Sequence, residues 1–263
     1  MQTPLFANVG WHYSGAKLSP DRTKIAYYKG QNSSGSSLCI NSIYGDAEYC
    51  VASQSSGSSQ HSASWLLGFA WHPTGQSLVW TKYSGTRDSS NYSTVMRVHN
   101  LADGTTSTIY TKTTPSQEFR IYGWSHDGRY VYGSMYGSND RKQFDVYTNS
   151  FSDFNIIPSL GLQSRDGRYW SYTVLRNPSY RAVVLYDTVT NTETELSTYD
   201  VSGKTLMCSD GVFSVSGEYV YYTKHYTGTG YSNNGTSLHA VHIPTMTSTE
   251  LLDISSDIIA IYE

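Results

Sequence analysis

The segment FSVSGEYVYYTK, residues 213–224, has a tight-turn sequence followed by a run of tyrosine and valine that is typical of a β-strand. Two further segments have the same form: GWSHDGRYVYGSM from Gly123 and LQSRDGRYWSYTV from Leu162. In each, a serine opens the turn, a glycine follows within it, and aromatic residues fill the strand. A turn and a strand that recur several times in one chain indicate an array of similar structural repeats.

The turn recurs five times, at a spacing of about 50 residues that is typical of such arrays. Around each turn the pattern predicts a short strand, the turn itself, a second strand, a variable loop, a third strand, another tight turn and a fourth strand. The third repeat is expected to lack its fourth strand, because only FNIIPSL (154–160) stands in that place. No long helix is predicted, since no window keeps apolar residues at helical spacing. The residues that open the five turns are Ser19, His72, Ser125, Ser164 and Ser214.

Four antiparallel strands in each of five repeats are the signature of a β-propeller. SPDRTKIAYY from Ser19 and WSHDGRYVYGS from Trp124 resemble the repeat core of the TolB-like, or PD40, family of WD40-like propellers. The same repeats build the propellers of the prolyl oligopeptidase and dipeptidyl peptidase IV families. The resemblance implies a fold rather than a function, because this repeat core is structural.

We therefore expect an all-β chain that forms a single β-propeller domain over residues 1–263. Five four-stranded blades are the first interpretation. Two terminal segments, MQTPLFANV and SSDIIAIYE, lie outside the five repeats. Either segment could complete a blade by pairing with the opposite end of the chain. A ring of six blades, one of them composite, is therefore the alternative.

Aromatic residues recur at equivalent positions of the repeats and are expected to pack between blades. Asp127 and Asp166 lie in the repeated turn, where we expect them to accept hydrogen bonds from turn amides rather than to act in catalysis. His72 replaces the turn serine and is expected to be structural. The predicted packing residues are Trp71, Trp124, Phe213, Tyr132, Tyr172 and Tyr221.

The connections at the two ends of each blade differ in length. First-to-second and third-to-fourth connections are short turns, whereas second-to-third connections and the links between repeats are long and rich in Ser, Gly, Asn and Tyr. Loops on a rigid scaffold often carry binding residues, and this composition resembles that of antibody paratopes. Tolerated insertions are the alternative explanation. The predicted contact residues of this long-loop face are Arg87, Tyr92, Arg141, Tyr180, Tyr226 and Tyr231.

Three cysteines are too few for a disulfide scaffold. Cys39 and Cys50 flank INSIYGDAEY, which is predicted to form a hairpin, so the two could face each other on neighbouring strands. A disulfide and two reduced cysteines are both compatible with this, because strand pairing alone does not give disulfide geometry. Cys208 has no evident partner and is expected to be a small core residue.

Charge and hydropathy exclude several classes of partner. The 18 Lys and Arg are scattered and the net charge is −3, so the chain has no basic stripe for nucleic acid. No apolar stretch approaches the roughly 20 residues of a membrane span. The segment MQTPLFANVG lacks the features of a signal peptide, although an extracellular, virion-surface or periplasmic location fits the composition.

No catalytic or metal-binding motif stands out, and no cofactor is expected. The chain contains no G-x-S-x-G, H-E-x-x-H or C-x-x-C. His239 and His242 are three apart on one predicted strand, so they point to opposite faces and make a poor metal pair. The predicted innermost strands carry almost no carboxylates, which argues against a glycosidase.

The sequence therefore predicts a non-enzymatic binding or assembly module for a protein partner, such as a structural or adsorption component of a virion. Such a part could act as an oligomer or within a larger assembly. The alternative is a carbohydrate-binding, lectin-like propeller whose loop tyrosines stack on sugars, or less favourably a carbohydrate-active one.

Overall fold

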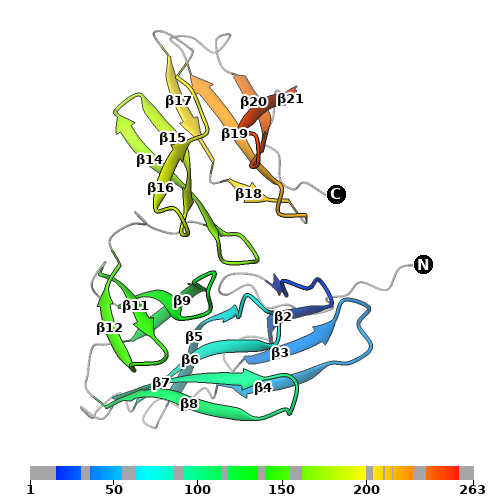
Figure 1. Cartoon of the computed structure of the whole chain (residues 1–263), viewed down its shortest axis with the longest axis vertical. Coiled ribbons are helices and arrows are strands. Elements are labelled where there is room, and N and C mark those ends of the chain that lie inside the picture. The colour runs from blue at the N-terminus through cyan, green and yellow to red at the C-terminus, as the bar shows by residue number, and fades with distance from the viewer. Residues whose placement is uncertain are drawn as a thin grey trace. The chain divides into compact units, whose positions relative to one another are not determined.

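The computed structural model is an all-β structure (Figure 1). It describes residues 16–30, 36–54, 63–85, 92–113, 118–135, 140–154, 162–199, 204–209, 211–214, 216–227 and 235–254. Contacts divide the chain into two compact units, Met1–Phe154 and Asn155–Glu263, and each is described by itself. The single domain over residues 1–263 stays a prediction.

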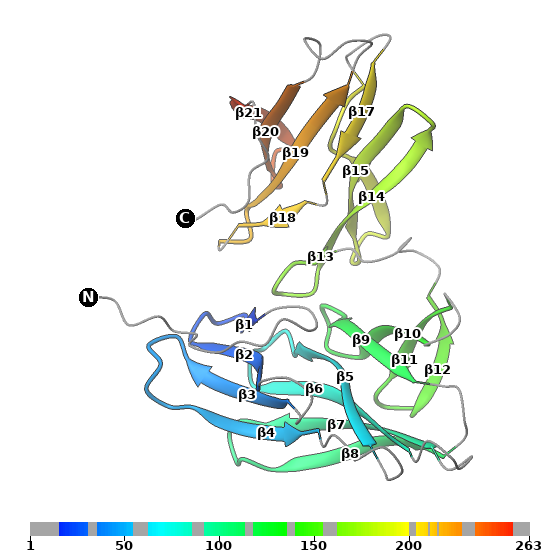
Figure 2. The ribbon, with the colours of Figure 1, turned by 180° about the vertical axis from the view of Figure 1, so that it is seen from behind.

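The first unit contains three four-stranded antiparallel sheets, one for each of the first three repeats (Figure 2). In every sheet the strands follow each other in chain order. The strands of repeat one are β1 (Lys17–Leu18), β2 (Lys24–Lys29), β3 (Ser37–Ser42) and β4 (Tyr49–Ser53). Those of repeat two are β5 (Ala63–Trp71), β6 (Ser77–Gly85), β7 (Tyr92–Asn100) and β8 (Thr106–Lys112). Those of repeat three are β9 (Phe119–Trp124), β10 (Tyr130–Met135), β11 (Arg141–Asp145) and β12 (Ser150–Asp153).

The second unit contains repeats four and five, joined into one nine-stranded sheet by an additional strand, β17 (Thr205–Cys208). β17 pairs in parallel with β15 and antiparallel with β19. The strands of repeat four are β13 (Leu162–Gln163), β14 (Tyr169–Asn177), β15 (Tyr180–Asp187) and β16 (Thr192–Glu195). Those of repeat five are β18 (Val212–Phe213), β19 (Tyr219–Thr227), β20 (Gly235–His242) and β21 (Thr247–Ile254).

All five repeats have four strands, as predicted for four of them, and two expectations were wrong. Repeat three does have a fourth strand, β12, because the turn that precedes it lies at 146–149 and not further along the chain. The connection between the second and third strands of repeat four is not a long loop. β14 extends to Asn177 and β15 begins at Tyr180, which leaves a tight hairpin.

The repeated turn is held by similar side-chain hydrogen bonds in each repeat, and repeat two, with His72 in place of serine, has only part of the set. In repeat three, Ser125 Oγ donates to the Asp127 carboxylate and accepts from the Tyr130 amide at 2.8 Å. Asp127 also accepts from the Arg129 amide at 3.0 Å, as predicted for a structural carboxylate. Ser164 and Asp166 form the same bonds in repeat four, and Thr74 and Ser216 replace the aspartate in repeats two and five.

The two short turns of each repeat lie at the same end of the sheet, because one backbone hydrogen bond joins them. In repeat three, the amide of Val146 donates to the carbonyl of Arg129 at 3.1 Å. The Arg129 guanidinium also forms an ion pair with Asp145, at 2.7 Å. The equivalent backbone bonds in the other repeats are Ile43–Thr23, Leu101–Gln76, Thr188–Arg168 and Ile243–Glu218.

Both short turns contain a residue with positive φ. In the first turn it is Gly75, Gly128, Gly167 or Gly217, whereas repeat one has Arg22 there at φ 62°. In the second turn it is Gly or Asn in the first four repeats, and Met246 at φ 51° in repeat five. Residues other than Gly, Asn and Asp are strained in this conformation, so Arg22 and Met246 are local departures from the repeat.

Apolar side chains pack between consecutive repeats. Repeats one and two share a core, and repeats two and three share another on the opposite face of β5 and β6. The turns also touch: the His72 ring packs edge-on against Trp124 at 4.9 Å between ring centroids. The first core contains Ala26, Tyr28, Leu38, Ile40, Leu66, Phe69, Trp71, Leu78 and Trp80. The second contains Ala70, Val79, Met96, Phe119, Ile121, Trp124, Val131 and Phe144.

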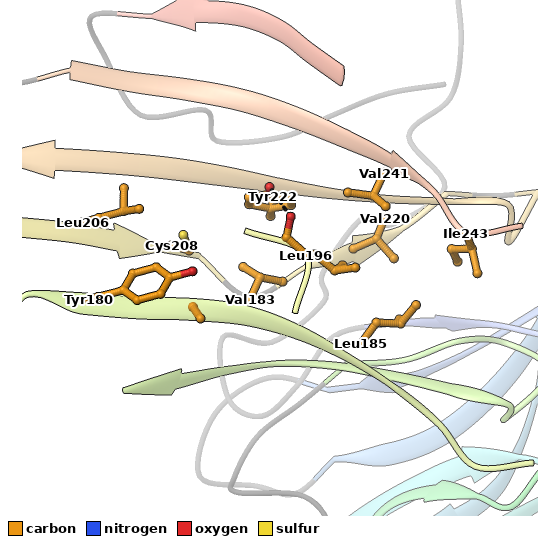
Figure 3. Close-up of a cluster of buried hydrophobic side chains, with 11 residues drawn as sticks. Tyr180, Val183, Leu185, Leu196, Leu206, Cys208, Val220, Tyr222, Val241 and Ile243 are labelled. Atoms are coloured by element: carbon orange, nitrogen blue, oxygen red, sulfur yellow. Dashed lines mark hydrogen bonds between the residues drawn. The ribbon is translucent and has the colours of Figure 1, made fainter. Parts of the chain in front are cut away.

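The core of the second unit lies between repeats four and five (Figure 3). Strands β15, β17, β19 and β20 each contribute side chains to it, and the Tyr222 hydroxyl donates to the carbonyl of Leu196 at 3.0 Å. The core comprises Tyr180, Ala182, Val183, Leu185, Leu196, Leu206, Cys208, Val220, Tyr222, Val241 and Ile243.

Candidate ligand-binding site on the first strands

The first strands of repeats one to three, β1, β5 and β9, are joined by one lysine side chain. Lys17 Nζ donates to the carbonyl of Phe69 on β5 at 2.9 Å and to the carbonyl of Tyr122 on β9 at 3.0 Å. In return, the Trp71 indole donates to the carbonyl of Lys17 at 2.8 Å. Three first strands from widely separated parts of the sequence therefore meet at the Lys17 amine.

Strand edges explain why a cation is held there. β1, β5 and β9 are each the terminal strand of their sheet, so some of their carbonyls have no partner within the sheet. The Lys17 amine satisfies two of these carbonyls. Lys17 is half-buried, and burial lowers the pKa of its amine to about 8. Among the described residues, no carboxylate forms an ion pair with it.

Two arginines lie on the repeat-three sheet, whose strand β9 supplies the Tyr122 carbonyl. Arg120 of β9 pairs with Ser134 of β10, and Ser134 pairs with Arg141 of β11. Residues directly opposite in antiparallel strands share one face of the sheet, so the two arginines flank the serine on that face. The Tyr122 hydroxyl lies 2.5 Å from Ser134 Oγ. We refer to Lys17, Arg120, Tyr122, Ser134 and Arg141 as the Tyr122 basic cluster.

Partial burial affects the charges of this cluster. Arg141 is half-buried, and this burial lowers the pKa of its guanidinium. Glu118, just before β9, is affected in the opposite sense: burial raises its pKa, and Arg120 partly offsets the rise. The cluster thus contains three basic side chains, with the Glu118 carboxyl close enough to Arg120 to interact with it.

Such an arrangement can bind an anion. Guanidinium groups bind carboxylates with paired, charge-assisted hydrogen bonds, and partial desolvation strengthens the attraction. The two hydroxyls between the arginines can exchange hydrogen bonds with a neutral part of the same ligand. A carboxylate-bearing group therefore matches the cluster better than a neutral one.

The structure places the six predicted contact residues in different surroundings. Arg141 belongs to the Tyr122 basic cluster. Arg87 and Tyr231 lie outside the described residues, and Tyr92 begins β7 but its side chain is not described. Tyr226 is half-buried on β19, with Lys204 Nζ 4.9 Å from its ring centroid.

Tyr180 requires a correction. It is 6% exposed, and its hydroxyl is bonded to the Glu195 carboxylate at 2.5 Å and to the carbonyl of Ser197 at 2.7 Å. The tight hairpin before β15 brings this ring into the core of the second unit instead of into a surface loop. Tyr180 is therefore not available to a partner at the surface.

The residues predicted to pack between repeats divide into two groups. Trp71 and Trp124 are buried in the two cores of the first unit, and Phe213 packs against the core of the second unit. The tyrosines lie elsewhere: Tyr132 stacks on Phe154 at 4.3 Å, Tyr172 is buried with its hydroxyl bonded to Glu193 at 2.5 Å, and Tyr221 is half-buried.

Cys39 and Cys50 form a disulfide between β3 and β4, where they are direct register partners. The hairpin prediction placed them correctly, and the open question of their oxidation is answered by the bond. Cys208 is buried on β17 within the core of the second unit.

Sequence reasoning missed Lys17 and Arg120. A signal for Arg120 was present, because FRIYGW (119–124) alternates Phe and Ile with Arg and Tyr, which places the polar pair on one face of a strand. For Lys17 the signal appears only when the five repeats are aligned and compared. The residue two positions before the repeated turn is Ala70, Gly123, Leu162 or Val212 in the other repeats, and only repeat one has a charge there.

A serine, a histidine and a carboxylate also meet in repeat five, but not as a catalytic triad. His239 Nε2 lies 2.8 Å from Ser237 Oγ and 3.9 Å from the Glu250 carboxylate. A triad needs the acid on the other ring nitrogen, so that it can orient the base toward the nucleophile. Ser237 and His239 are both buried.

Within the described residues, no group of three His, Cys, Asp or Glu side chains could hold a metal ion. Over the same residues, no helix is long and apolar enough to span a membrane.

The sheets have the form found in β-propellers: four antiparallel strands for each sequence repeat, as separate sheets in repeats one to three and within one nine-stranded sheet in repeats four and five. No protein-family model and no curated protein matches the sequence. Solved structures do match. TolB from Acinetobacter baumannii is 16% identical with a TM-score of 0.50, and the alignment covers 89% of this chain and 53% of TolB.

Two enzymes match to a similar degree. An oligogalacturonate lyase from Vibrio parahaemolyticus is 12% identical with a TM-score of 0.54, over 92% of this chain and 66% of the lyase. Dipeptidyl peptidase 4 from Porphyromonas gingivalis is 13% identical with a TM-score of 0.51, over 92% of this chain and 46% of the peptidase. The chain thus spans less than two thirds of the length of each of these three proteins. It shares the fold of the TolB-like propellers, as the repeat motifs predicted.

Proposed function

We propose that this chain is a non-enzymatic propeller of five blades that binds an acidic segment of a partner protein. The five blades correspond to the five repeats, each of which supplies four strands. Two observations support the binding role: Arg120 and Arg141 flank Ser134 on one face of the repeat-three sheet, and the Lys17 amine binds a carbonyl of strand β9 in the same sheet.

The spacing of the arginines suits an extended acidic peptide. Arg120 and Arg141 lie two strands apart on one face, which separates their Cα atoms by about 10 Å. Carboxylates on alternate residues of an extended peptide are about 7 Å apart, and the long arginine side chains can close the difference. Arg87, Tyr92, Tyr226 and Tyr231, the other residues predicted from the long loops, stay separate candidates for contact with the partner.

An assembly or adsorption component of a virion or a cell surface is the setting that we propose for this module. The Cys39–Cys50 bond supports it, because disulfides persist in oxidising environments such as virion and cell surfaces. A carboxylated saccharide is the second candidate ligand. The hydroxyls of Tyr122 and Ser134 between the two arginines favour it, since they can pair with sugar hydroxyl groups.

Calorimetric titration with a short oligoglutamate and with oligogalacturonate tests the proposal. The Arg120→Gln and Arg141→Gln variants should each bind the peptide about tenfold more weakly, as expected for the loss of one charge-assisted contact. Arg181→Gln is the matched control, because Arg181 is exposed on β15 in the second unit. Binding of the saccharide alone would favour the second candidate. Equal affinity in all variants, or no binding of either ligand, would overturn the proposed role of the cluster.

A further inference from the structure

One face of the repeat-five sheet carries aromatic and aliphatic side chains from all four strands. Register partners in antiparallel strands share a face, and so do alternate residues of one strand. Tyr219 and Tyr221 stack with their ring centroids 6.3 Å apart, and the Tyr219 ring lies 4.9 Å from that of its register partner, His242. We call this side of the sheet the Tyr221 face. It consists of Val212, Tyr219, Tyr221, Thr223, His225, Thr236, Leu238, Ala240, His242, Thr247, Thr249 and Leu252.

The two sides of this sheet differ in burial. Val220, Tyr222 and Val241, on the opposite side, belong to the core of the second unit (Figure 3). Large apolar side chains of the Tyr221 face are exposed instead, and so is Leu251, the additional residue of a β-bulge beside Leu252. An exposed apolar patch of this kind marks an interaction site in globular proteins. The exposed fractions are 49% for Val212, 36% for Tyr219, 47% for Leu251 and 53% for Leu252.

Repeat two shows what such a face contacts inside this protein. Six apolar residues of the repeat-five sheet have apolar counterparts at the same positions of repeat two, including a second bulge at Ile109. All six counterparts pack into or against the core that repeats two and three share. Tyr110, the counterpart of Leu252, has its ring 5.5 Å from that of Phe144 and 5.0 Å from that of Phe151, both in repeat three. A face with this pattern is therefore suited to being covered by a second apolar sheet. The counterparts of Val212, Tyr221, Leu238, Ala240, Leu251 and Leu252 are Ala70, Val79, Met96, Val98, Ile109 and Tyr110.

Charge indicates which sheet can cover the Tyr221 face. Among its described residues and at the Leu251 bulge, none is Lys, Arg, Asp or Glu, so two copies of the face can meet without burying a charge. The side of repeat one that lies opposite its core is a poorer match. Tyr27 lies there with its hydroxyl bonded to Glu48, which also pairs with Lys29. An apolar cover would remove these two charges from water.

We propose that the Tyr221 face is the interface of a homodimer, in which it packs against the Tyr221 face of a second copy. A two-fold axis brings the same patch of both copies together, so an apolar and uncharged patch is complementary to itself. The face spans a single repeat, and we therefore expect a weak dimer with a dissociation constant of about 10 µM. The inference goes beyond the proposed function and does not depend on it, because the Tyr122 basic cluster lies in the first unit.

Sedimentation equilibrium at concentrations from about 1 to about 200 µM tests this inference. The mean mass should rise from the 29.3 kDa of one chain toward twice that value. Leu252→Lys should weaken the dimer about tenfold or more, because its ammonium group would be buried in an apolar contact. Leu175→Lys is the matched control. Leu175 lies on β14 of repeat four and is 58% exposed, so its replacement should leave the dissociation constant unchanged.

Two results would overturn the inference. One is a wild-type chain that stays monomeric at the highest concentration, which would mean that a different partner or another segment of the chain covers the face. The other is a dimer that Leu252→Lys weakens no more than Leu175→Lys does. Circular dichroism checks the fold of each variant, and Thr249→Lys, at an exposed position of the same face, replaces Leu252→Lys if that variant does not fold. Arg120→Gln should weaken binding of the acidic peptide yet dimerise like the wild type, which separates this test from that of the proposed function.

Discussion

The short turns and the first strands of this protein differ in how far their polar residues recur from repeat to repeat. The turns carry the same Ser, Asp and Gly chemistry from repeat to repeat, with the same hydrogen bonds. The first strands share a backbone path but not their polar residues: Lys17 has an alanine, glycine, leucine or valine as its counterpart. In a repeat protein, residues that recur maintain the architecture, and unmatched charges on equivalent positions are the first place to look for function.

The Cys39–Cys50 disulfide, which the other repeats lack, is where we expect the largest effect on stability. Replacing both cysteines, by Cys39→Ala and Cys50→Ala, should lower the free energy of unfolding by about 3 kcal/mol, because the bond closes a short loop in the unfolded chain. Urea denaturation of the variant beside the oxidised wild type measures the difference. A loss below about 1 kcal/mol would mean that the β3–β4 hairpin is held by its strand pairing alone.

Gly128 tests the contact between the turns of repeats two and three. A Cβ at this position, φ 70°, would lie 2.2 Å from His72 Nε2, so Gly128→Ala should cost about 2–3 kcal/mol. Gly104→Ala is the matched control. Gly104 has φ 69° with nothing within 4 Å, so only the backbone term of about 1 kcal/mol remains. Thermal or urea denaturation measures the loss of stability in both variants. Equal losses for Gly128→Ala and Gly104→Ala would show that the His72 ring does not clash with a Cβ at position 128.

Lys17→Met should cost about 1–2 kcal/mol, since it leaves two carbonyls of the first strands without their donor. The cost should depend on pH. The folded pKa lies below that of an unfolded lysine, so the unfolded chain binds more protons between about pH 8 and 10.5. Wild-type stability should therefore rise relative to the variant across that range. Urea denaturation at pH 7.5 and 9.5 measures it, and a gap that is constant or narrows would contradict the assigned pKa.

The smallest effects are expected where the turns depart from their own pattern. Arg22→Gly and Met246→Gly should each raise stability by about 0.5 kcal/mol, because glycine relieves the strain at positive φ and its larger unfolded-state entropy offsets part of the gain. Asn191→Gly, at φ 56°, is the control and should change little, since asparagine tolerates this region. Thermal denaturation of each variant measures these changes in stability. If Arg22→Gly lowers stability instead, contacts of the arginine side chain outweigh the strain of its positive φ.

The sequence was a good guide wherever local chemistry decides the structure. All five first strands end at the predicted residue just before the turn, because the turn needs serine or histidine, aspartate or its substitute, and a residue that accepts positive φ. Strand β12 was not predicted, because its turn at 146–149 was not recognised: the residue with positive φ there is Asn149, at φ 53°, and the turn contains no glycine. The Cys39–Cys50 pairing was within reach because a hairpin is also local.

The candidate site was less accessible to sequence reasoning because it depends on contacts between distant residues. Lys17 and Tyr122 are 105 residues apart, and nothing in either segment shows that an amine from one meets a carbonyl of the other. Tyr180 illustrates the converse. Its segment has the composition of a loop, yet a two-residue hairpin and the hydrogen bonds to Glu195 and Ser197 take it into the core. Arg141 was selected as a loop residue and lies in the cluster as the first residue of β11.

The pairing of β17 with both β15 and β19 has a consequence for the way the last two repeats can vary. Repeats that meet only through side chains can be duplicated, deleted or exchanged one at a time, because each keeps its own sheet intact. Here a deletion of repeat five would remove the β19 partners of β17 (Thr205–Cys208), and a deletion of repeat four would remove the β15 partners of Leu206 and Met207. The two repeats are thus expected to be inherited, and to exchange their amide protons with solvent, as a pair.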